Sequence, residues 1–107
     1  MHKCDTGKSR CDLLPGRALI AVGQVLAYGA QKYAPSGWLT VPDAVPRYRA
    51  ALMRHALAML DGEELDQESG LPHIAHVATN ALFLLHFYLV HNGLGGGHVR
   101  NTAPFDL

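Results

Sequence analysis

Residues 72–91 read PHIAHVATNALFLLHFYLVH, and the segment 74–90 inside them is the longest apolar run in the chain. Four polar residues interrupt this run: His76, Thr79, Asn80 and His86. The run therefore predicts a buried helix and argues against a membrane span. Because apolar residues lie on nearly every side of it after Val77, two other helices can hardly cover it. We expect a second subunit against this helix, and hence a helical homo-oligomer.

Proline residues introduce two further helical segments, which we expect over residues 15–32 and 46–60. Proline suits a first helical turn because its missing N–H has no partner there. No segment alternates polar and apolar residues with a period of two, so we expect an all-α fold with three helices. The connecting segments 34–45 and 62–71 are long for so small a domain, and such loops are often functional.

The length of 107 residues corresponds to one domain. We expect an N-terminal arm over residues 1–13, then the helices, then a flexible tail over residues 93–107. Nine Lys and Arg balance nine Asp and Glu, which excludes a strongly basic nucleic-acid module. Residues 1–10 have no apolar core and so no secretory signal. We expect a cytoplasmic protein with reduced thiols at Cys4 and Cys11, and neither nucleic acid nor membrane as partner.

Three polar residues lie on one stripe of the third helix. His73, His76 and Asn80 have the spacing i, i+3 and i+7, which places them on one face. Burying such groups without partners costs about 1–3 kcal/mol each. They are therefore expected to bond to one another, to the second helix, to a ligand or to a metal. The alternative interpretation is a row of polar side chains whose hydrogen-bonding groups are all paired with other groups of the protein.

The second helix offers Arg47 and Arg54 on one face, with His55 beside them. Guanidinium groups are suited to phosphate because their donor fork matches two oxygens. This pattern favours an anionic ligand. A solvated basic face explains it equally well.

The loop 62–70 contains four carboxylates: Glu63, Glu64, Asp66 and Glu68. Carboxylates combined with imidazoles suit Mn²⁺, Zn²⁺ or Fe²⁺, whereas carboxylates alone suit Mg²⁺. With the nearby histidines they form a candidate metal site. The alternative is an acidic turn that caps the positive end of the third helix.

Cationic and aromatic residues outside these helix faces are further candidates. Gly7–Lys8–Ser9 is not a phosphate-binding loop, because no glycine lies five residues before Gly7 and no strand precedes it. Lys8 and Arg10 are placed either to reach an anionic ligand or to remain solvated. Lys32, Tyr33 and Trp38 follow a helix exit, where the aromatic rings either stack on a base or pack in the core.

The order of motifs along residues 5–90 is shared with a known family. The motifs are Asp5, Lys8 and Arg10; Leu14–Pro15; Gly29–Ala30 and Lys32–Tyr33; Trp38; Arg54–His55; Gly62–Glu63; Asp66 with Glu68–Ser69–Gly70; His73 and His76; and Asn80. This combination resembles the N-terminal domain family of phage dATP/dGTP diphosphohydrolases, which is related to MazG-like nucleotide pyrophosphohydrolases.

The resemblance implies an all-α, MazG-like, oligomeric and metal-dependent enzyme. It also implies hydrolysis of a deoxypurine triphosphate to the monophosphate and pyrophosphate. MazG-like enzymes hold Mg²⁺ with Glu-x-x-Glu on one helix and Glu-x-x-Asp on the next. This chain departs from that pattern, because its second helix has no carboxylate before Asp61 and His73-x-x-His76 stands on the third.

Three hypotheses follow. Under the first, the chain is a nucleoside triphosphate pyrophosphohydrolase in which a divalent metal (Mg²⁺, Mn²⁺ or Co²⁺) activates water. The metal ligands would come from Glu63, Glu64, Asp66, His73 and His76. The catalytic residues would be His55, as a proton shuttle, with Glu63 and His76. The residues expected to bind substrate are Lys8, Arg10, Lys32, Tyr33, Trp38, Arg54 and Asn80.

Under the second hypothesis, the same residues capture a nucleotide, such as a signalling nucleotide, without cleaving it. The missing carboxylate pairs favour this alternative. Under the third, the chain is a structural oligomerisation domain whose polar seam fixes the register of its helices.

Overall fold

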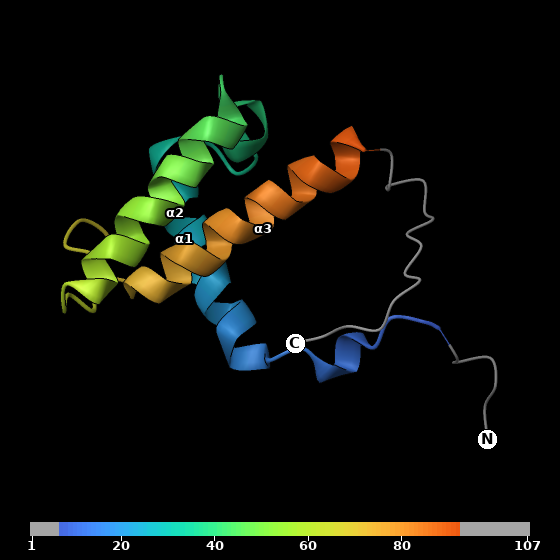
Figure 1. Ribbon diagram of the computed structural model, residues 1–107, viewed down its shortest axis with the longest axis horizontal. Coiled ribbons are helices and arrows are strands. Elements are labelled where there is room, and N and C mark those ends of the chain that lie inside the picture. Colours follow the sequence, from blue (N-terminus) through green and yellow to red (C-terminus); the bar gives the residue numbers. More distant parts are fainter. Residues whose placement is uncertain (1–6, 93–107) are drawn as a thin grey trace.

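The computed structural model describes residues 7–92, which fold into helices (Figure 1). The elements in order are η2 (Cys11–Leu13), α1 (Gly16–Lys32), η3 (Gly37–Thr40), α2 (Ala44–Leu60) and α3 (His73–His91). Within residues 7–92 there is no strand, only an isolated bridge between Leu65 and Pro72. The all-α fold with three long helices is therefore confirmed, and the relation to MazG-like folds stays a prediction. The predicted tail, residues 93–107, and the first six residues with Cys4 lie outside the described residues.

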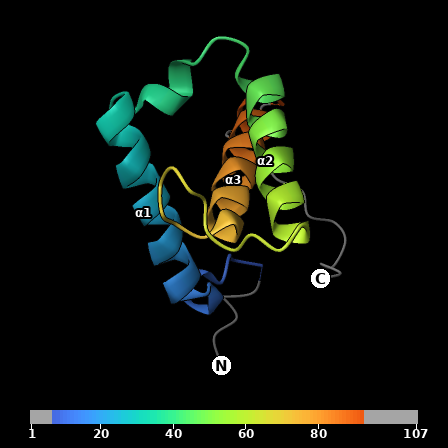
Figure 2. The same cartoon turned by 90° about the vertical axis from the view of Figure 1, so that its left-hand side faces the viewer.

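Helices α2 and α3 pack side by side, and α1 packs against α3 from the other side. Figure 2 shows α1 apart from α2, with α3 and the loop 61–72 between them. The short helix η3 connects α1 to α2 at one end of this arrangement. The three long helices and η3 thus surround a space that the loop 61–72 borders.

Proline positions set the helix starts, although not always at the predicted residue. Pro15 and Pro72 precede the first residues of α1 and α3 as their N-caps. Helix α2 begins at Ala44, two residues before the predicted start, because Asp43 turns the chain with a left-handed φ of 53°. Pro46 therefore lies inside the first turn, where its missing N–H leaves no hydrogen bond unmade.

The predicted helix ends at Lys32, Leu60 and His91 are confirmed. After α2 the chain turns at Gly62, and before α3 it turns again at Gly70, with φ values of 97° and 75°. Side chains rarely adopt these backbone angles, so the two glycines fix where the loop bends.

The buried residues divide α3 into two parts. Its first turns bury the polar side chains of His73, His76, Thr79 and Asn80. Its later turns leave large apolar side chains exposed: Leu82, Leu85, Tyr88 and Val90. Among the described residues 7–92, the later turns of this helix therefore present uncovered apolar surface, as expected from the sequence.

By length and composition alone, α3 passes a test for a membrane-crossing helix. A core helix of a soluble protein passes the same test. Here two buried polar residues of its first turns bond to groups outside the helix, His73 to His55 of α2 and His76 to Ser69 of the preceding loop. This arrangement is typical of a bundle core, since hydrocarbon provides no partners for such groups.

Candidate functional site

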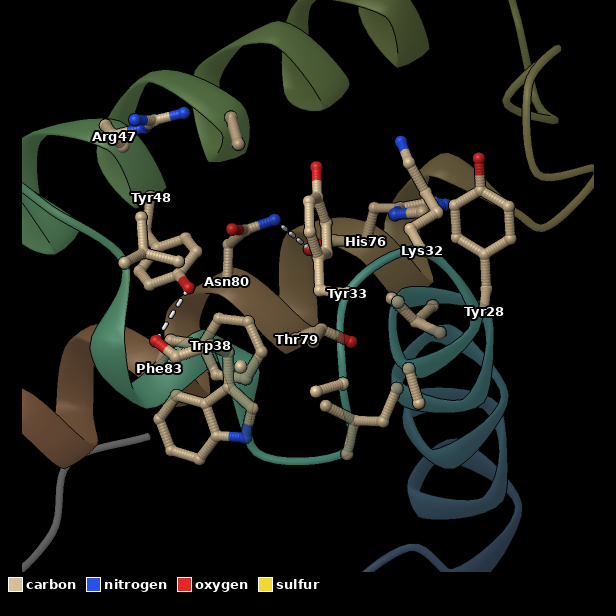
Figure 3. Close-up of a pocket in the computed structure, with 18 of the residues that line it drawn as sticks. Tyr28, Lys32, Tyr33, Trp38, Arg47, Tyr48, His76, Thr79, Asn80 and Phe83 are labelled. Atoms are coloured by element: carbon tan, nitrogen blue, oxygen red, sulfur yellow. Dashed lines mark hydrogen bonds between the residues drawn. The ribbon is translucent and has the colours of Figure 1, made fainter.

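A cavity of about 680 Å³ opens between α1, η3, α2 and α3 (Figure 3). This size falls within the range of roughly 300–1,000 Å³ that is typical of small-molecule sites. Its cationic lining residues are Lys32, Arg47 and Arg54. Its main aromatic lining residues are Tyr28, Tyr33, Trp38, Tyr48 and Phe83. Its other polar and acidic lining residues include His55, Asp66, Glu68, His76, Thr79 and Asn80.

Three histidines meet where α2 packs against the start of α3. The Nδ1 atoms of His55 and His73 lie 2.8 Å apart, so one ring donates a hydrogen bond to the other. The ring of His55 also stacks on that of His76, with centroids 4.3 Å apart and planes inclined by 9°. Because His55 comes from α2 and the other two from α3, the helix pairing assembles this cluster.

His55, His73 and Asp66 form a group that could hold a metal ion. One ligand atom from each of the three lies within 4.8 Å of the other two. In an octahedral site with metal–nitrogen distances of about 2.1 Å, neighbouring ligands lie about 3.0 Å apart. The 2.8 Å between the two Nδ1 atoms is close to this spacing. Two imidazoles and a carboxylate therefore fit a divalent transition metal.

The far side of the His73 ring supports the same interpretation. Its Nε2 is buried without a hydrogen-bond partner among residues 7–92, and it lies 3.5 Å from Glu63 Oε1. When one ring nitrogen of a histidine binds metal, the other commonly donates its N–H to a carboxylate, which fixes the ring. Glu63 is thus placed to orient His73.

Asp66 is held by a tight turn in the loop before α3. Its Oδ2 accepts a hydrogen bond of 2.8 Å from the backbone N–H of Ser69. The hydroxyl of Ser69 lies 2.7 Å from His76 Nε2 and accepts the N–H of Leu71. Ser69 thereby links Asp66 to His76, whose Nε2 is 3.8 Å from Asp66 Oδ2.

Burial and neighbouring charges set the protonation of this cluster. Burial lowers the pKa of His55 and of His76, and the adjacent imidazoles lower both further. Burial alone would raise the pKa of Asp66, but the hydrogen bonds from Ser69 and the nearby imidazoles of His76 and His55 outweigh it, so this pKa is lowered. At neutral pH, His55 and His76 are therefore neutral imidazoles beside the Asp66 carboxylate, the forms that bind metal ions.

The cationic side of the cavity comes from α1 and α2. Lys32 Nζ lies 3.6 Å from Glu68 Oε1 and over the rings of Tyr28 and Tyr33. Arg47 and Arg54 line the cavity from α2 and are exposed, and neither forms an ion pair with another residue between 7 and 92. Their guanidinium groups are therefore available to an anionic ligand.

The aromatic side of the cavity is partly fixed by internal packing. Trp38 stacks on Phe83 with ring centroids 4.4 Å apart and planes inclined by 9°. Tyr48 donates a hydrogen bond of 2.8 Å to the Trp38 carbonyl. One face of Trp38 is therefore occupied by the protein. The Tyr33 side chain, in contrast, is largely exposed at the cavity and remains available to a ligand.

Comparison with known proteins identifies the family to which this chain belongs. Residues 1–95 match the sequence profile of the family described as "dATP/dGTP diphosphohydrolase, N-terminal". This chain belongs to that family. It is 36% identical over 90 residues to a "dATP/dGTP diphosphohydrolase" of Salmonella phage PMBT28, an alignment that covers 84% of this chain and 30% of the relative. No solved structure gives a significant match.

In this member of the dATP/dGTP diphosphohydrolase N-terminal family, most predicted site residues converge on the cavity. Eight of them line it: Lys32, Tyr33, Trp38, Arg54, His55, Asp66, His76 and Asn80. The predicted ligands Asp66 and His73 lie in the histidine cluster, with Glu63 behind it. His55, predicted as a proton shuttle, lies at the centre of the same cluster.

Three predicted residues lie elsewhere. Arg10 pairs with Asp12 at 2.9 Å and both are exposed, while Lys8 is also exposed, and neither basic residue lines the cavity. The Glu64 side chain is exposed, and its backbone carbonyl accepts the N–H of His73. Glu64 therefore contributes to the turn before α3 through its backbone.

Sequence reasoning missed Ser69, Tyr48 and Phe83 as site residues. The Asp66-x-x-Ser69 spacing was a usable signal, because a side-chain carboxylate often caps the N–H three residues later. Tyr48 and Phe83 carried no such local signal. They reach the cavity because α2, η3 and α3 meet there.

Proposed function

We propose that this domain binds a deoxypurine nucleoside triphosphate in the cavity and hydrolyses it to the monophosphate and pyrophosphate. One observation carries the proposal: the same cavity joins two unpaired guanidinium groups to a histidine and aspartate cluster suited to metal. The printed name of the phage relative supports this chemistry. The chain spans about a third of that relative, so its activity is proposed here for this domain alone.

His55, Asp66 and His73 would hold a divalent metal such as Mn²⁺, Co²⁺ or Mg²⁺. When bound, such an ion neutralises phosphate charge and lowers the pKa of a coordinated water. Glu63 would keep the His73 ring in its orientation, and the Ser69 turn would keep Asp66 in place. The nitrogen ligands favour Mn²⁺ and Co²⁺ over Mg²⁺.

Arg54, with Arg47 and Lys32, would bind the triphosphate and offset its charge. Water would attack the α-phosphorus, and the bond from that phosphorus to the bridging oxygen would break, releasing pyrophosphate. His76 is placed to accept the proton from this water, because its ring lines the cavity and its lowered pKa keeps it neutral at pH 7. General-base catalysis needs such a neutral imidazole.

The test is incubation of the chain with dGTP or dATP and each of Mg²⁺, Mn²⁺ and Co²⁺. We expect equal amounts of monophosphate and pyrophosphate, separated by chromatography, and no inorganic phosphate. Absence of products with every metal would overturn the hydrolysis. If, in addition, no nucleotide raised the melting temperature, the chain would act as a structural domain.

Capture without cleavage is the second candidate, and one observation favours it. Helix α2 (Ala44–Leu60) contains no carboxylate, so it lacks the paired acidic ligands of MazG-like enzymes. Under this alternative the cations and aromatic rings bind a nucleotide without metal. Calorimetry in EDTA, followed by recovery of intact nucleotide, would distinguish capture from hydrolysis.

We further propose that a second copy of the chain covers the later turns of α3. Leu85 is 51% exposed, and Leu82, Tyr88 and Val90 are also exposed on this helix. Apolar surface of this extent is usually covered by a partner. Sedimentation of the chain in solution would report the dimer or larger assembly.

A further inference from the structure

We propose that Asn80 reads the base of the bound nucleotide by accepting a hydrogen bond from one of its N–H groups. This inference rests on the proposed nucleotide site and assigns a specificity-determining residue within it. Asn80 is only 7% exposed, yet it lines the cavity. Figure 3 shows its side chain between Tyr48 and Tyr33.

Chemistry fixes which end of the Asn80 amide faces the cavity. The Nδ2 group donates a hydrogen bond of 2.8 Å to the carbonyl of His76, one helical turn earlier. A carbonyl only accepts, so the amide cannot be reversed without losing this bond. The Oδ1 atom therefore points the other way, and no group between residues 7 and 92 donates to it.

Neighbouring hydroxyl groups add acceptors rather than donors. Thr79 donates its hydroxyl hydrogen to the Ala75 carbonyl at 2.8 Å. Tyr48 donates its own to the Trp38 carbonyl at 2.8 Å. The hydrogen atoms of both hydroxyls are thus engaged within the protein. Beside Asn80, the cavity offers oxygen acceptors to a ligand.

The cavity lining therefore contains two chemically different kinds of group. Lys32, Arg47 and Arg54 donate hydrogen bonds and carry positive charge, which suits phosphate groups. The region around Asn80 accepts hydrogen bonds and is mostly buried, which suits the N–H groups of a base. A nucleotide carries the matching groups, namely anionic phosphates and the N–H groups of its base.

A hydrogen-bond acceptor at Asn80 defines which bases are favoured. Adenine offers its N6 amino group, and guanine offers N1–H and its N2 amino group. A purine with hydrogen in place of both exocyclic groups offers no N–H on this edge. Such a base would leave Oδ1 of Asn80 buried without a partner, and a site built around a hydrogen bond discriminates strongly against a ligand that lacks it.

The test compares three probes on the whole chain: the α,β-methylene analogues of dATP, of dGTP and of the unsubstituted purine deoxyribonucleoside triphosphate. These analogues resist cleavage between the α and β phosphates. Trp38 is the only tryptophan and lines the cavity, so its fluorescence reports each Kd. We expect the unsubstituted purine to bind about tenfold more weakly than the other two.

The Asn80→Leu variant should remove this preference. We expect it to bind all three probes with similar Kd values, close to that of the unsubstituted purine with the unchanged chain. A purely structural role of Asn80 would weaken all three equally and preserve the preference. Should this variant not fold, Asn80→Ala also removes the acceptor and provides the same comparison, and the three probes on the unchanged chain test the inference without any variant.

Two outcomes separate this inference from the proposed function. Equal binding of all three probes by the unchanged chain would overturn the role of Asn80 and leave the nucleotide site standing. Binding of none of them, with or without Mn²⁺, would overturn the nucleotide site and this inference together.

Discussion

The two parts of α3 differ sharply, although they belong to one continuous helix. From His73 to Asn80 the helix buries polar side chains, and all of these face other polar groups or the cavity. From Leu82 onward it exposes apolar side chains such as Leu85 and Tyr88. Folding of a single chain favours the reverse arrangement, because buried polar groups destabilise and buried apolar groups stabilise. This contrast is the basis of our proposals of a ligand site at the first part and of a protein partner at the second.

Removal of a proposed metal-ligating side chain from the first part of α3 should have the largest effect on activity. We expect His73→Ala to reduce pyrophosphate release by about 100-fold or more, because it removes one of the three proposed metal ligands. Calorimetric titration with Mn²⁺ should show at least about a tenfold loss of affinity. His91→Ala is the matched control, since His91 is exposed in the last turn of the same helix. Equal activity of the two variants would contradict the metal site.

The cations opposite α3 should show a smaller effect. We expect Arg54→Ala to weaken nucleotide binding by about 10- to 100-fold, because a charge-assisted hydrogen bond is lost. The loss should shrink as salt increases, since salt screens an exposed charge. Arg49→Ala is the control, because Arg49 is exposed on the same helix and does not line the cavity. Similar Kd values for both variants would separate Arg54 from the phosphate site.

A charge introduced into the second part of α3 tests whether this surface mediates self-association. We expect Leu85→Glu to weaken self-association by about tenfold or more, because a carboxylate cannot be buried in an apolar interface without a partner. Sedimentation velocity measures the change. Leu60→Glu, at the exposed end of α2, should leave the assembly intact. A monomeric unchanged chain would mean that another protein, or nothing, covers this surface.

The sequence predicted local features of this molecule better than distant ones. Helical periodicity and proline positions predicted the three helices with ends at the observed residues. The stripe of His73, His76 and Asn80 was also visible, because it depends only on helical spacing. The contact between His55 and His73 could not be predicted from the sequence, because the residues are 18 positions apart and meet only through helix packing. Tyr48 and Phe83 were missed for the same reason, because they reach the cavity only where α2, η3 and α3 meet.

The smallest expected effect is a pH dependence that belongs to the first part of α3 and its neighbour on α2. In EDTA, we expect the melting temperature to fall as the pH decreases from 7.5 to 5.5. Burial lowers the pKa of His55 and His76 in the folded chain, so the unfolded chain binds more protons below about pH 6.5. The lowered pKa of Asp66 acts in the same direction but only near pH 4 and below.

The control for this pH dependence is again in the second part of α3. His91→Gln should retain the full dependence, because that side chain is exposed at the end of the helix. His55→Gln should reduce it, because one of the two imidazoles with a lowered pKa is then absent. Mn²⁺ should steepen the fall, since protons compete with the metal for the same nitrogens. A melting temperature that stayed constant or rose toward pH 5.5 would mean that these imidazoles are solvated, and the contrast between the two parts of the helix would then lose its electrostatic basis.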